Sequence, residues 1–378
     1  MKKIIFWCPF FGKIGTVKAV INSAVALNSQ TNFKCFIINS VGEFDEYKNI
    51  FKKHNIKEIR FFKKSIINFL PKNGFISSRL SFVIISILCF FPLLFFLRKN
   101  KNVVFFSYLL TSLPLLIFTI FNINSTLFLK VSGKINYTFF RKLLFKISKN
   151  KINKIFFQTI ESKKKFQKLF SYDYKKLVML EDPIIDLEII KKLEKKKIEK
   201  KFLKKKYFVS IGRLSKQKNF LFLVKCIKEI IKFQKNYNFL ILGDGEEKRI
   251  IKKYILENNL SSSVFLIGYR NNVFKYLNNS VGLICTSLWE EPGFIIQEAA
   301  SCKKIILTSD CYSGPSEFLD YNKDGYVFRN NNKESFISNF KKMIQEKSKH
   351  KKKINKNYKK IKLYTKKNFQ LRIKKYLI

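Results

Sequence analysis

Short apolar runs alternate with longer amphipathic stretches along most of this chain. The runs are rich in β-branched and aromatic residues and are bounded by Gly, Asn or Ser, which is typical of buried parallel strands. We expect such strands at Ile4–Cys8, Cys35–Asn39, Val103–Phe106, Thr126–Val131, Lys154–Phe157, Leu177–Leu180, Tyr207–Ile211, Phe239–Leu242, Val264–Ile267, Gly282–Cys285 and Lys304–Thr308. The stretches between them have helical character and predict βα units. The expected fold class is therefore α/β, with two doubly wound sheets.

A run of lysines marks the expected domain boundary. Ten of the sixteen residues in Lys191–Lys206 are Lys, which predicts a solvated helix followed by a linker. We expect an N-terminal domain over residues 1–190 and a C-terminal domain over residues 200–350. Residues 351–378 combine many lysines with periodic apolar positions, which predicts a basic C-terminal helix. The first apolar run is too short for a signal peptide, so a strand is expected there.

One segment departs from the pattern of a soluble domain. Ser81–Leu97 has seventeen residues without a charge and contains Pro92. As a helix it would be about 26 Å long, which is just short of an easy bilayer crossing. A true span would place strands of one sheet on opposite sides of the membrane, so we expect a peripheral or buried helix instead. The flanking Lys63, Lys64 and Arg79 suit a helix that lies at an anionic membrane surface.

Composition narrows the class of protein. The 378 residues are enough for two domains with separate cores, and 47% apolar residues argue against disorder. The formal net charge is +49. Because Lys, Ile, Phe and Asn are over-used everywhere, an AT-rich genome accounts for part of that charge. The remainder favours an anionic partner such as a membrane surface or a polyphosphate. No nucleic-acid-binding module is recognisable, so no specific nucleic-acid partner is expected.

The cysteines and histidines argue against metal and disulfide chemistry. The seven Cys are an odd number without a CxxC pair and lie mostly in apolar runs. This indicates a reducing cytosol and neither a disulfide framework nor a zinc site. The only histidines, His54 and His350, lie in basic segments. We therefore expect a cytoplasmic protein with no metal and no cofactor.

Two cations follow a predicted strand of the C-terminal half. Arg213 comes directly after Tyr207–Ile211 and Gly212, and Lys218 stands five residues later, before a helical run. Open α/β sheets bind ligands at the carboxyl ends of their strands. The guanidinium fork and the ammonium suit a diphosphate. In a chain with 75 basic residues, however, the pair alone is equally consistent with ordinary surface cations.

Two carboxylates surround a predicted helix start further on. Glu290 and Glu298 are eight residues apart, and Pro292 suits the first turn of a helix. The free N–H groups of Gly293, Phe294 and Ile295 would then form a phosphate cradle. Glu290 would reach a sugar, and Glu298 a ribose. Taken alone, the acidic residues are also consistent with a merely favourable negative first turn.

The order of these motifs resembles a known family. Gly212-Arg213-Leu with Lys218-Asn219, then Gly243-Asp-Gly245-Glu246, Gly268-Tyr269, Glu290 with Glu298, and Ser309-Asp310 with Gly314-Pro315 and Glu317 occur in sequence. The chain resembles the retaining glycosyltransferases of family 4 over most of residues 205–330. It is most similar to members that build bacterial surface polysaccharides or oligosaccharides. The resemblance implies the GT-B fold, in which two Rossmann-like domains face a central cleft.

The resemblance also implies roles for individual residues. Arg213 and Lys218 would bind the donor diphosphate and stabilise the leaving nucleotide, while Glu290 would contact the transferred sugar. Glu298 would hold the ribose of the donor. The remaining donor contacts would come from the backbone of Gly293, Phe294 and Ile295, and from Gly268 and Tyr269 near the base. No metal is required, because fixed cations and a helix start neutralise the leaving group.

The N-terminal half resembles the family more weakly. Gly12 and Gly15 follow the first strand and are similar to the glycine-rich loop on the acceptor side, although a simple strand-to-helix turn would give the same pattern. Ser107 and Tyr108 stand where many relatives have a His, so no catalytic role is carried over to that position. The stretch 130–133 and Arg141 are also family-like and are expected to face the acceptor.

The first hypothesis is a retaining transferase for a hexose or N-acetylhexosamine. A UDP- or GDP-sugar would be the donor, and a growing glycan, polyprenyl-linked, the acceptor. The protein would lie peripherally on the cytoplasmic face of the inner membrane. The main alternative is a non-catalytic basic protein that binds membrane or nucleic acid on a degenerate GT-B scaffold. A phosphorylase or phosphosugar transferase of the same fold is a third possibility, for which the donor would be a sugar phosphate.

Overall fold

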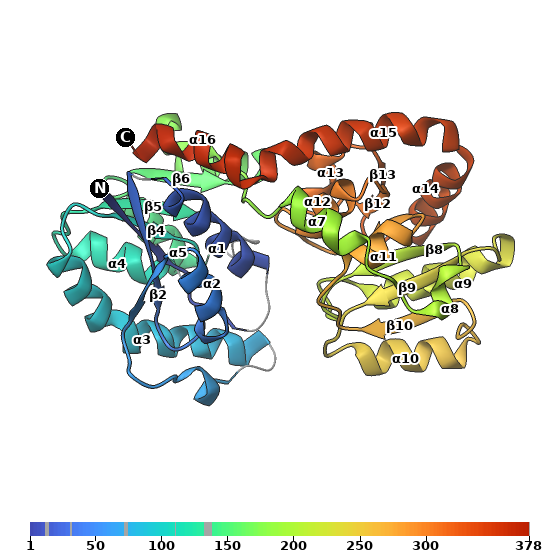
Figure 1. The fold of residues 1–378 in the computed structure, drawn as a ribbon, viewed down its shortest axis with the longest axis horizontal. Coiled ribbons are helices and arrows are strands. Elements are labelled where there is room, and N and C mark those ends of the chain that lie inside the picture. The colour runs from blue at the N-terminus through green and yellow to red at the C-terminus, as the bar shows by residue number, and fades with distance from the viewer. Residues whose placement is uncertain (12–14, 31, 72–74, 110, 132–137, 378) are drawn as a thin grey trace. The chain divides into compact units, whose positions relative to one another are not determined.

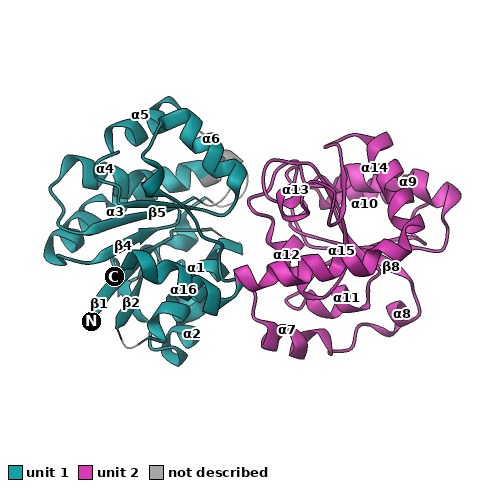
Figure 2. Ribbon diagram, turned by 90° about the horizontal axis from the view of Figure 1, so that it is seen from above, with its two compact units in different colours: residues 1–184, 365–378 teal, residues 185–364 magenta. Residues whose placement is uncertain are grey.

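The chain folds into two compact units, each built on its own sheet. A computed structural model describes residues 1–11, 15–30, 32–71, 75–109, 111–131 and 138–377. Unit 1 comprises Met1–Ile184 together with Thr365–Ile378, and unit 2 comprises Ile185–Tyr364 (Figure 2). The expected boundary near residue 190 therefore lies close to the observed one, but the last residues of the chain return to the first unit.

Unit 1 contains a seven-stranded parallel sheet in the order β3-β2-β1-β4-β5-β6-β7 (Figure 1). Its strands are β1 Lys2–Trp7, β2 Phe33–Asn39, β3 Lys57–Arg60, β4 Val104–Ser107, β5 Thr126–Lys130, β6 Lys154–Phe157 and β7 Leu177–Met179. Its α-helices are α1 Gly15–Asn28, α2 Lys48–Lys53, α3 Phe75–Lys99, α4 Ser112–Ile120, α5 Phe139–Ile147, α6 Ile160–Phe170 and α16 Lys366–Leu377. The chain order reverses between β1 and β4, as in a doubly wound sheet.

Successive side chains of the unit 1 strands pack into different helix layers. Ile5 and Trp7 of β1 join the core beneath α3, α4, α5 and α6, whereas Ile4 and Phe6 join the core beneath α1, α2 and α16. This follows from the two-residue period of a strand, which sends neighbouring side chains to opposite faces. Figure 2 shows the two helix layers on opposite sides of the sheet. Burial on both faces explains why the strands are continuously apolar.

Unit 2 contains a six-stranded parallel sheet in the order β10-β9-β8-β11-β12-β13. Its strands are β8 Tyr207–Ile211, β9 Asn238–Leu242, β10 Val264–Gly268, β11 Gly282–Cys285, β12 Ile305–Ser309 and β13 Tyr326–Phe328. Its α-helices are α7 Leu187–Glu194, α8 Lys200–Leu203, α9 Phe220–Phe233, α10 Lys248–Glu257, α11 Phe274–Asn279, α12 Phe294–Ser301, α13 Pro315–Phe318, α14 Lys333–Gln345 and α15 Lys347–Lys360. The α9, α10 and α14 helices cover one face. The fold class is thus confirmed.

Two parts of the sequence-based description differ from the structure. The edge strands β3 and β13 were not expected, because each has only three or four residues and no long apolar run. The single basic helix expected over 351–378 is wrong. Instead α15 ends at Lys360, a 3₁₀ turn covers Ile361–Tyr364, and α16 begins at Lys366. The last segment then packs on α1 of unit 1.

The apolar segment Ser81–Leu97 lies within α3, which packs on the unit 1 sheet by one face. Ile85, Cys89, Leu93 and Leu97 on that face are fully buried. Among the described residues, 79–99 is the one helix long and apolar enough to cross a membrane, and a third of its apolar window is buried. α3 is therefore a partly buried helix that covers the sheet, and its contact with a membrane surface stays a prediction.

A buried ion pair ties two strands of the unit 1 sheet together. Lys130 ends β5, and its Nζ lies 3.1 Å from Oδ1 of Asp182, which follows β7. Both side chains have no exposed surface. The same ammonium donates a hydrogen bond to the carbonyl of Leu180. A charge in this position is tolerated only because its partner is buried with it.

This pair gives a stability prediction. Lys130→Met leaves the Asp182 carboxylate buried without its cation, so we expect a loss of about 3–5 kcal/mol in the free energy of unfolding. The double variant Lys130→Met/Asp182→Leu removes both charges and is expected to recover most of that loss. Urea unfolding followed by circular dichroism measures both. A single variant as stable as the wild type would contradict the role assigned to the pair.

Candidate functional site

The candidate site lies at the carboxyl ends of β8 and β11, the two central strands of the unit 2 sheet, between which the strand order reverses. β8 and β11 are neighbours, with Phe208 opposite Gly282 and Val209 opposite Leu283. Each strand is followed by one of the predicted motifs. A reversal point of this kind leaves an opening at the carboxyl ends of the two strands, because the chain leaves them for helices on opposite faces. The fold thus brings the two motifs together.

Lys218 and Glu290 form an ion pair in this opening. The ammonium of Lys218 contacts Oε1 of Glu290, and the hydroxyl of Ser287 donates to the same oxygen at 2.6 Å. The Glu290 side chain is 7% exposed and that of Lys218 is 20% exposed. Two donors on one buried carboxylate oxygen fix the rotamer of Glu290. Ser287 was not singled out from the sequence, although it lies three residues before Glu290.

Hydrogen bonds to backbone carbonyls join the two loops that carry this pair. The amide of Leu288 donates to the carbonyl of Gln217 at 2.8 Å, and the Gln217 side chain donates to the carbonyl of Trp289 at 2.9 Å. The hydroxyl of Thr286 donates to the carbonyl of Lys218 at 3.1 Å. None of these hydrogen bonds uses the side chain of Lys218 or Glu290, so the contact between the loops does not depend on what these two side chains bind.

Arg213 lies in the same loop but in a different environment. Its Nε is 3.2 Å from Oε2 of Glu246, and the two side chains are 64% and 57% exposed. An exposed pair of this kind contributes little to stability and exchanges readily with other anions. Arg213 is therefore an exposed guanidinium, whereas Lys218 is a largely buried ammonium that is held by Glu290.

Gly243 sets the position of the Arg213 loop. A Cβ on this residue would lie 1.8 Å from the carbonyl oxygen of Gly212, so the turn after β9 approaches that loop as closely as its backbone allows. The amide of Leu214 donates to the carbonyl of Asp244 at 2.9 Å. The amide of Gly243 donates to Gly268 at the end of β10 at 3.0 Å. The ends of β8, β9 and β10 are thus connected by backbone contacts.

The helix start after Glu290 differs in detail from the expectation. α12 begins at Phe294, so Pro292 precedes the helix and is not in its first turn. Gly293 is the N-cap residue, with a left-handed backbone (φ 80°) that favours glycine. The amides of Phe294 and Ile295 remain in the first turn, where an α-helix leaves its N–H groups without intrahelical partners.

The other predicted donor residues occupy the same edge of unit 2. Glu298 lies in the second turn of α12 and is half-buried. Gly268 ends β10 with a positive φ of 78°, and Tyr269 follows it with 52% of its surface exposed. The segment after β12 also holds the Glu290 loop, because the amide of Ser313 donates to the carbonyl of Glu290 at 2.7 Å.

The electrostatics of the pair can be assigned from its surroundings. Burial disfavours the charged form of Lys218, but the neighbouring Glu290 carboxylate outweighs it, so the pKa of Lys218 is raised. Burial raises the pKa of Cys285 as well, and Glu290 adds to this effect. Cys285 is therefore a neutral thiol, whereas Lys218 keeps its positive charge at neutral pH.

The predicted residues of the N-terminal half lie in unit 1. Gly15 begins α1, while Gly12 falls outside the described residues. Tyr108 is buried, and its hydroxyl donates to Ser23 of α1 at 3.0 Å. Ser107 at the end of β4 is buried too. Neither side chain is directed to an open surface.

The expectation that Lys130 faces an acceptor is wrong. Its ammonium is fully buried against Asp182, which lies 52 positions later in the chain and could not be paired with it from the sequence. The continuation over residues 132–133 lies outside the described residues. Arg141 is half-exposed on α5.

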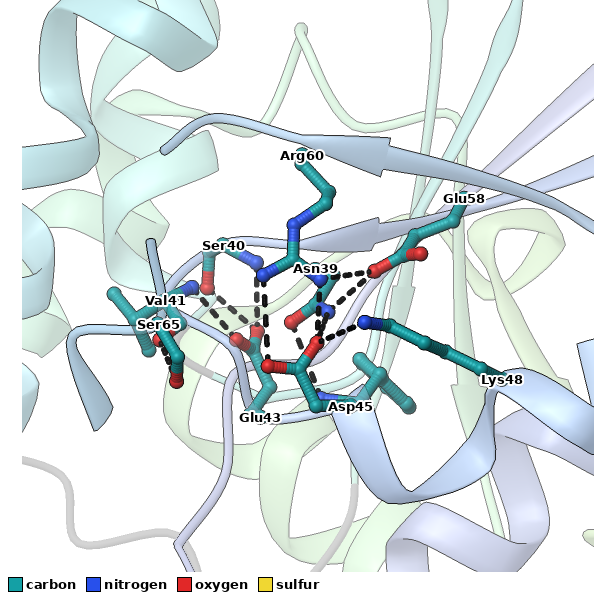
Figure 3. A network of polar contacts seen from close by, with 10 residues as sticks. Asn39, Ser40, Val41, Glu43, Asp45, Lys48, Glu58, Arg60 and Ser65 are labelled. Atoms are coloured by element: carbon teal, nitrogen blue, oxygen red, sulfur yellow. Dashed lines mark hydrogen bonds and ion pairs between the residues drawn. The ribbon is translucent and has the colours of Figure 1, made fainter. Parts of the chain in front are cut away.

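A buried carboxylate that the sequence did not indicate lies after β2. Glu43 accepts hydrogen bonds from the amides of Ser40 and Val41, at 3.0 and 2.7 Å, and from the Ser40 hydroxyl at 2.6 Å (Figure 3). Burial raises the pKa of Glu43, although these hydrogen bonds oppose the rise. Every donor comes from the same loop. Glu43 therefore shapes this loop.

The same region holds a second polar group centred on Arg60. Its guanidinium is paired with Asp45 and lies 2.9 Å from Glu58, and Asn39 donates to Asp45 at 3.0 Å (Figure 3). Hydrogen bonding to Arg60 lowers the pKa of Asp45. These residues connect the ends of β2 and β3 and satisfy one another. They stabilise the sheet edge and offer no unpartnered group for chemistry.

Within the described parts of the chain, no group of three or more His, Cys, Asp or Glu residues is placed to hold a metal ion. All seven cysteines are buried as free thiols.

Residues 191–361 match the sequence profile of the family described as "Glycosyl transferases group 1". The chain is 33% identical over 122 residues to the poly(ribitol-phosphate) alpha-N-acetylglucosaminyltransferase of Staphylococcus aureus. It is 27% identical over 177 residues to the N-acetylgalactosamine-N,N'-diacetylbacillosaminyl-diphospho-undecaprenol 4-alpha-N-acetylgalactosaminyltransferase of Campylobacter jejuni. These alignments cover 32% and 47% of this chain, and only 25% and 47% of the two relatives.

Solved structures extend the similarity to both units. The crystal structure of TarM superposes with a TM-score of 0.76 at 16% identity, covering 100% of this chain and 99% of that one. The structure of Anabaena HepE in complex with UDP and glucose gives a TM-score of 0.73 at 15% identity, with coverage of 100% and 99%. The fold of the whole chain is therefore GT-B, as predicted.

The raised pKa of Lys218 predicts how its contribution to stability varies with pH. A lysine with a higher pKa in the folded state stabilises fully below its unfolded value, about 10.4, and progressively less as the pH rises through the folded value. We expect Lys218→Met to be less stable than the wild type by about 2–3 kcal/mol at pH 8, and this difference to shrink only above about pH 10.5.

Urea unfolding of the two proteins between pH 7 and pH 11 measures this difference. The exposed Lys252 of α10 provides the control, because Lys252→Met removes one lysine without touching the pair. A difference that already declines between pH 7 and pH 9 would contradict an ion pair at this position.

Proposed function

We propose that this chain is a retaining glycosyltransferase of family 4 that uses a nucleotide-sugar donor. The observation that carries the proposal is the Lys218–Glu290 pair with Arg213 beside it, at the reversal point of the unit 2 sheet. The match of residues 191–361 to group 1 glycosyltransferases covers all three residues and supports it. The donor is a UDP- or GDP-sugar, and the complexes of HepE with UDP and glucose favour UDP.

In this proposal the diphosphate takes the place of carboxylates as the partner of the cations. Glu246 leaves Arg213 easily, because that pair is exposed. Lys218 is already buried and fixed, so it binds phosphate without a large cost of ordering. The first-turn amides of Phe294 and Ile295 add donors at a helix start, which favours an anion. Glu298 accepts from the ribose hydroxyls.

The chemistry is a displacement at the anomeric carbon. The bond between that carbon and the diphosphate oxygen breaks, and the leaving nucleotide keeps the electron pair. Arg213 and Lys218 stabilise the charge that develops on it. A bond forms to the acceptor hydroxyl on the same face, and the hydroxyl proton passes to the leaving phosphate. Glu290, held by Ser287, binds a hydroxyl of the transferred hexose or N-acetylhexosamine.

The acceptor in this proposal is a growing bacterial surface glycan linked to a polyprenyl diphosphate. The support is the Campylobacter jejuni relative, whose name specifies a diphospho-undecaprenol substrate. We assign the acceptor to unit 1, where Gly15 begins α1 at the carboxyl end of β1. An acceptor of this kind places the enzyme peripherally on the cytoplasmic face of the inner membrane.

Nucleotide binding is tested by thermal unfolding with UDP, GDP, ADP and their sugars. A ligand at about 100 times its dissociation constant adds about 2.7 kcal/mol to the free energy of unfolding, which corresponds to a rise of about 5–10 °C in the midpoint. We expect this rise with one nucleotide class, and its loss in Glu298→Ala. Glu257→Ala on the exposed face of α10 is the matched control and should keep the rise. No rise with any nucleotide would favour the non-catalytic alternative.

Sugar transfer is tested separately with Glu290→Gln. The amide keeps the size of the side chain but removes the negative charge that pairs with Lys218, and its NH₂ group can no longer accept a hydrogen bond from a sugar hydroxyl. We expect turnover to fall about 10²–10³-fold, because an interaction with the reacting sugar is lost. The rise in melting midpoint with nucleotide should persist, since Glu290 does not contact the nucleotide. Near-normal turnover in this variant would falsify the assignment of Glu290.

A further inference from the structure

The solvent-facing side of α3, α4 and α5 in unit 1 carries an unusual number of large apolar side chains. α3 contacts α4, and α4 contacts α5, so the three helices form one layer over the sheet. We call their outer surface the α3–α5 face. Its exposed large apolar residues are Leu80, Val83, Ile87, Leu88, Phe91 and Phe95 of α3, Ile120 of α4, and Phe139, Phe140, Leu143 and Ile147 of α5.

The spacing of the exposed residues along α3 puts them on the side of the helix opposite to its buried residues. Along α3 they recur every three or four positions from Leu80 to Phe95, which defines one side of a helix, while Ile85, Cys89 and Leu93 on the other side are buried. Phe91 and Phe95 are each 61% exposed, and Phe139 is 84% exposed. Large exposed apolar side chains gathered on neighbouring helices are typical of an interaction site in soluble proteins.

The positive charge of the segment that contains these helices indicates that the partner of the α3–α5 face is anionic. Residues 59–160 contain sixteen Lys and Arg but no Asp or Glu, so all 26 acidic residues of the chain lie outside this segment. A genome-wide bias toward lysine acts on the whole chain and does not explain an acid-free stretch of this length. The cations border the apolar residues, with Arg79, Arg98 and Lys99 exposed at the ends of α3 and Lys142 and Lys146 exposed on α5.

We propose that the α3–α5 face is a docking surface for an anionic lipid bilayer. The aromatic and aliphatic side chains enter the interface, and the cations bind the lipid phosphates. α3 lies along the bilayer surface without crossing it, because its other side covers the sheet. The proposal adds a partner surface to the lipid-linked acceptor of the proposed function. Vesicle binding needs no nucleotide or sugar transfer, so the two proposals can fail independently.

The test is co-sedimentation of the full chain with vesicles of phosphatidylcholine alone and with added phosphatidylglycerol. We expect binding that requires phosphatidylglycerol and weakens in about 1 M salt, where the Debye length is about 3 Å. Phe91→Ser/Phe95→Ser in α3 and Phe139→Ser/Phe140→Ser in α5 should each weaken binding about tenfold or more, since two rings leave the interface.

A matched control lies on α10 of unit 2, where Ile250 and Leu256 are 50% and 57% exposed. Ile250→Ser/Leu256→Ser removes comparable apolar surface and should bind vesicles as the wild type does. Unchanged melting midpoints show that the substituted proteins fold. The proposal is overturned if the wild type does not bind phosphatidylglycerol vesicles, or if the α3 and α5 variants bind normally. It is also overturned if these variants instead abolish a dimer seen by light scattering, because the face would then join two copies of the chain.

Discussion

Parallel strands deliver all their carboxyl ends to one edge of a sheet, and the arrangement of both units depends on this constraint. In unit 2 the strand order reverses between the neighbouring strands β8 and β11, and hydrogen bonds join the loops that follow them. Lys218 and Glu290 meet there although 72 residues separate them. Gly243 allows the turn after β9 to approach the carbonyl of Gly212, and Gly293 supplies the left-handed backbone before α12. The chemistry of the edge is thus a consequence of sheet topology and of two positions without a side chain.

Acidic residues are the scarce partner in a chain with 75 basic and 26 acidic side chains. Several of the buried or nearly buried carboxylates are placed where they hold a cation in a defined position. Asp182 holds Lys130, Glu290 holds Lys218, and Asp324 holds Lys360 at 2.7 Å. Many of the other lysines in the described part of the chain are exposed. Position among carboxylates, and not abundance, therefore distinguishes the lysines that matter to the structure.

The sequence was sufficient for the fold class, because apolar runs and motif order are local signals. It also put Lys218 and Glu290 after two strands that the structure makes neighbours, while their roles stay predictions. β3 and β13 escaped detection, since Lys57–Arg60 contains three charged residues and Tyr326–Phe328 is only three residues long. Asp182 acts through a contact with Lys130, 52 positions earlier, which no local pattern indicates. Ser287 and Glu43 contact residues only two or three positions away, but the loop conformation that makes these contacts is not a sequence pattern. Pro292 was expected in the first turn of α12, but it precedes the N-cap residue Gly293, and the helix begins at Phe294.

The path of the last helix has a consequence for the order in which the chain folds during synthesis. Unit 2 is an insertion, since unit 1 consists of residues 1–184 and 365–378. Phe369, Ile373 and Leu377 of α16 complete the core beneath α1, and the ammonium of Lys2 donates to the carbonyl of Leu377 at 2.6 Å. These residues are translated after all of unit 2. Unit 2 therefore has all its residues available first, and the first unit to be translated is the last to close its core.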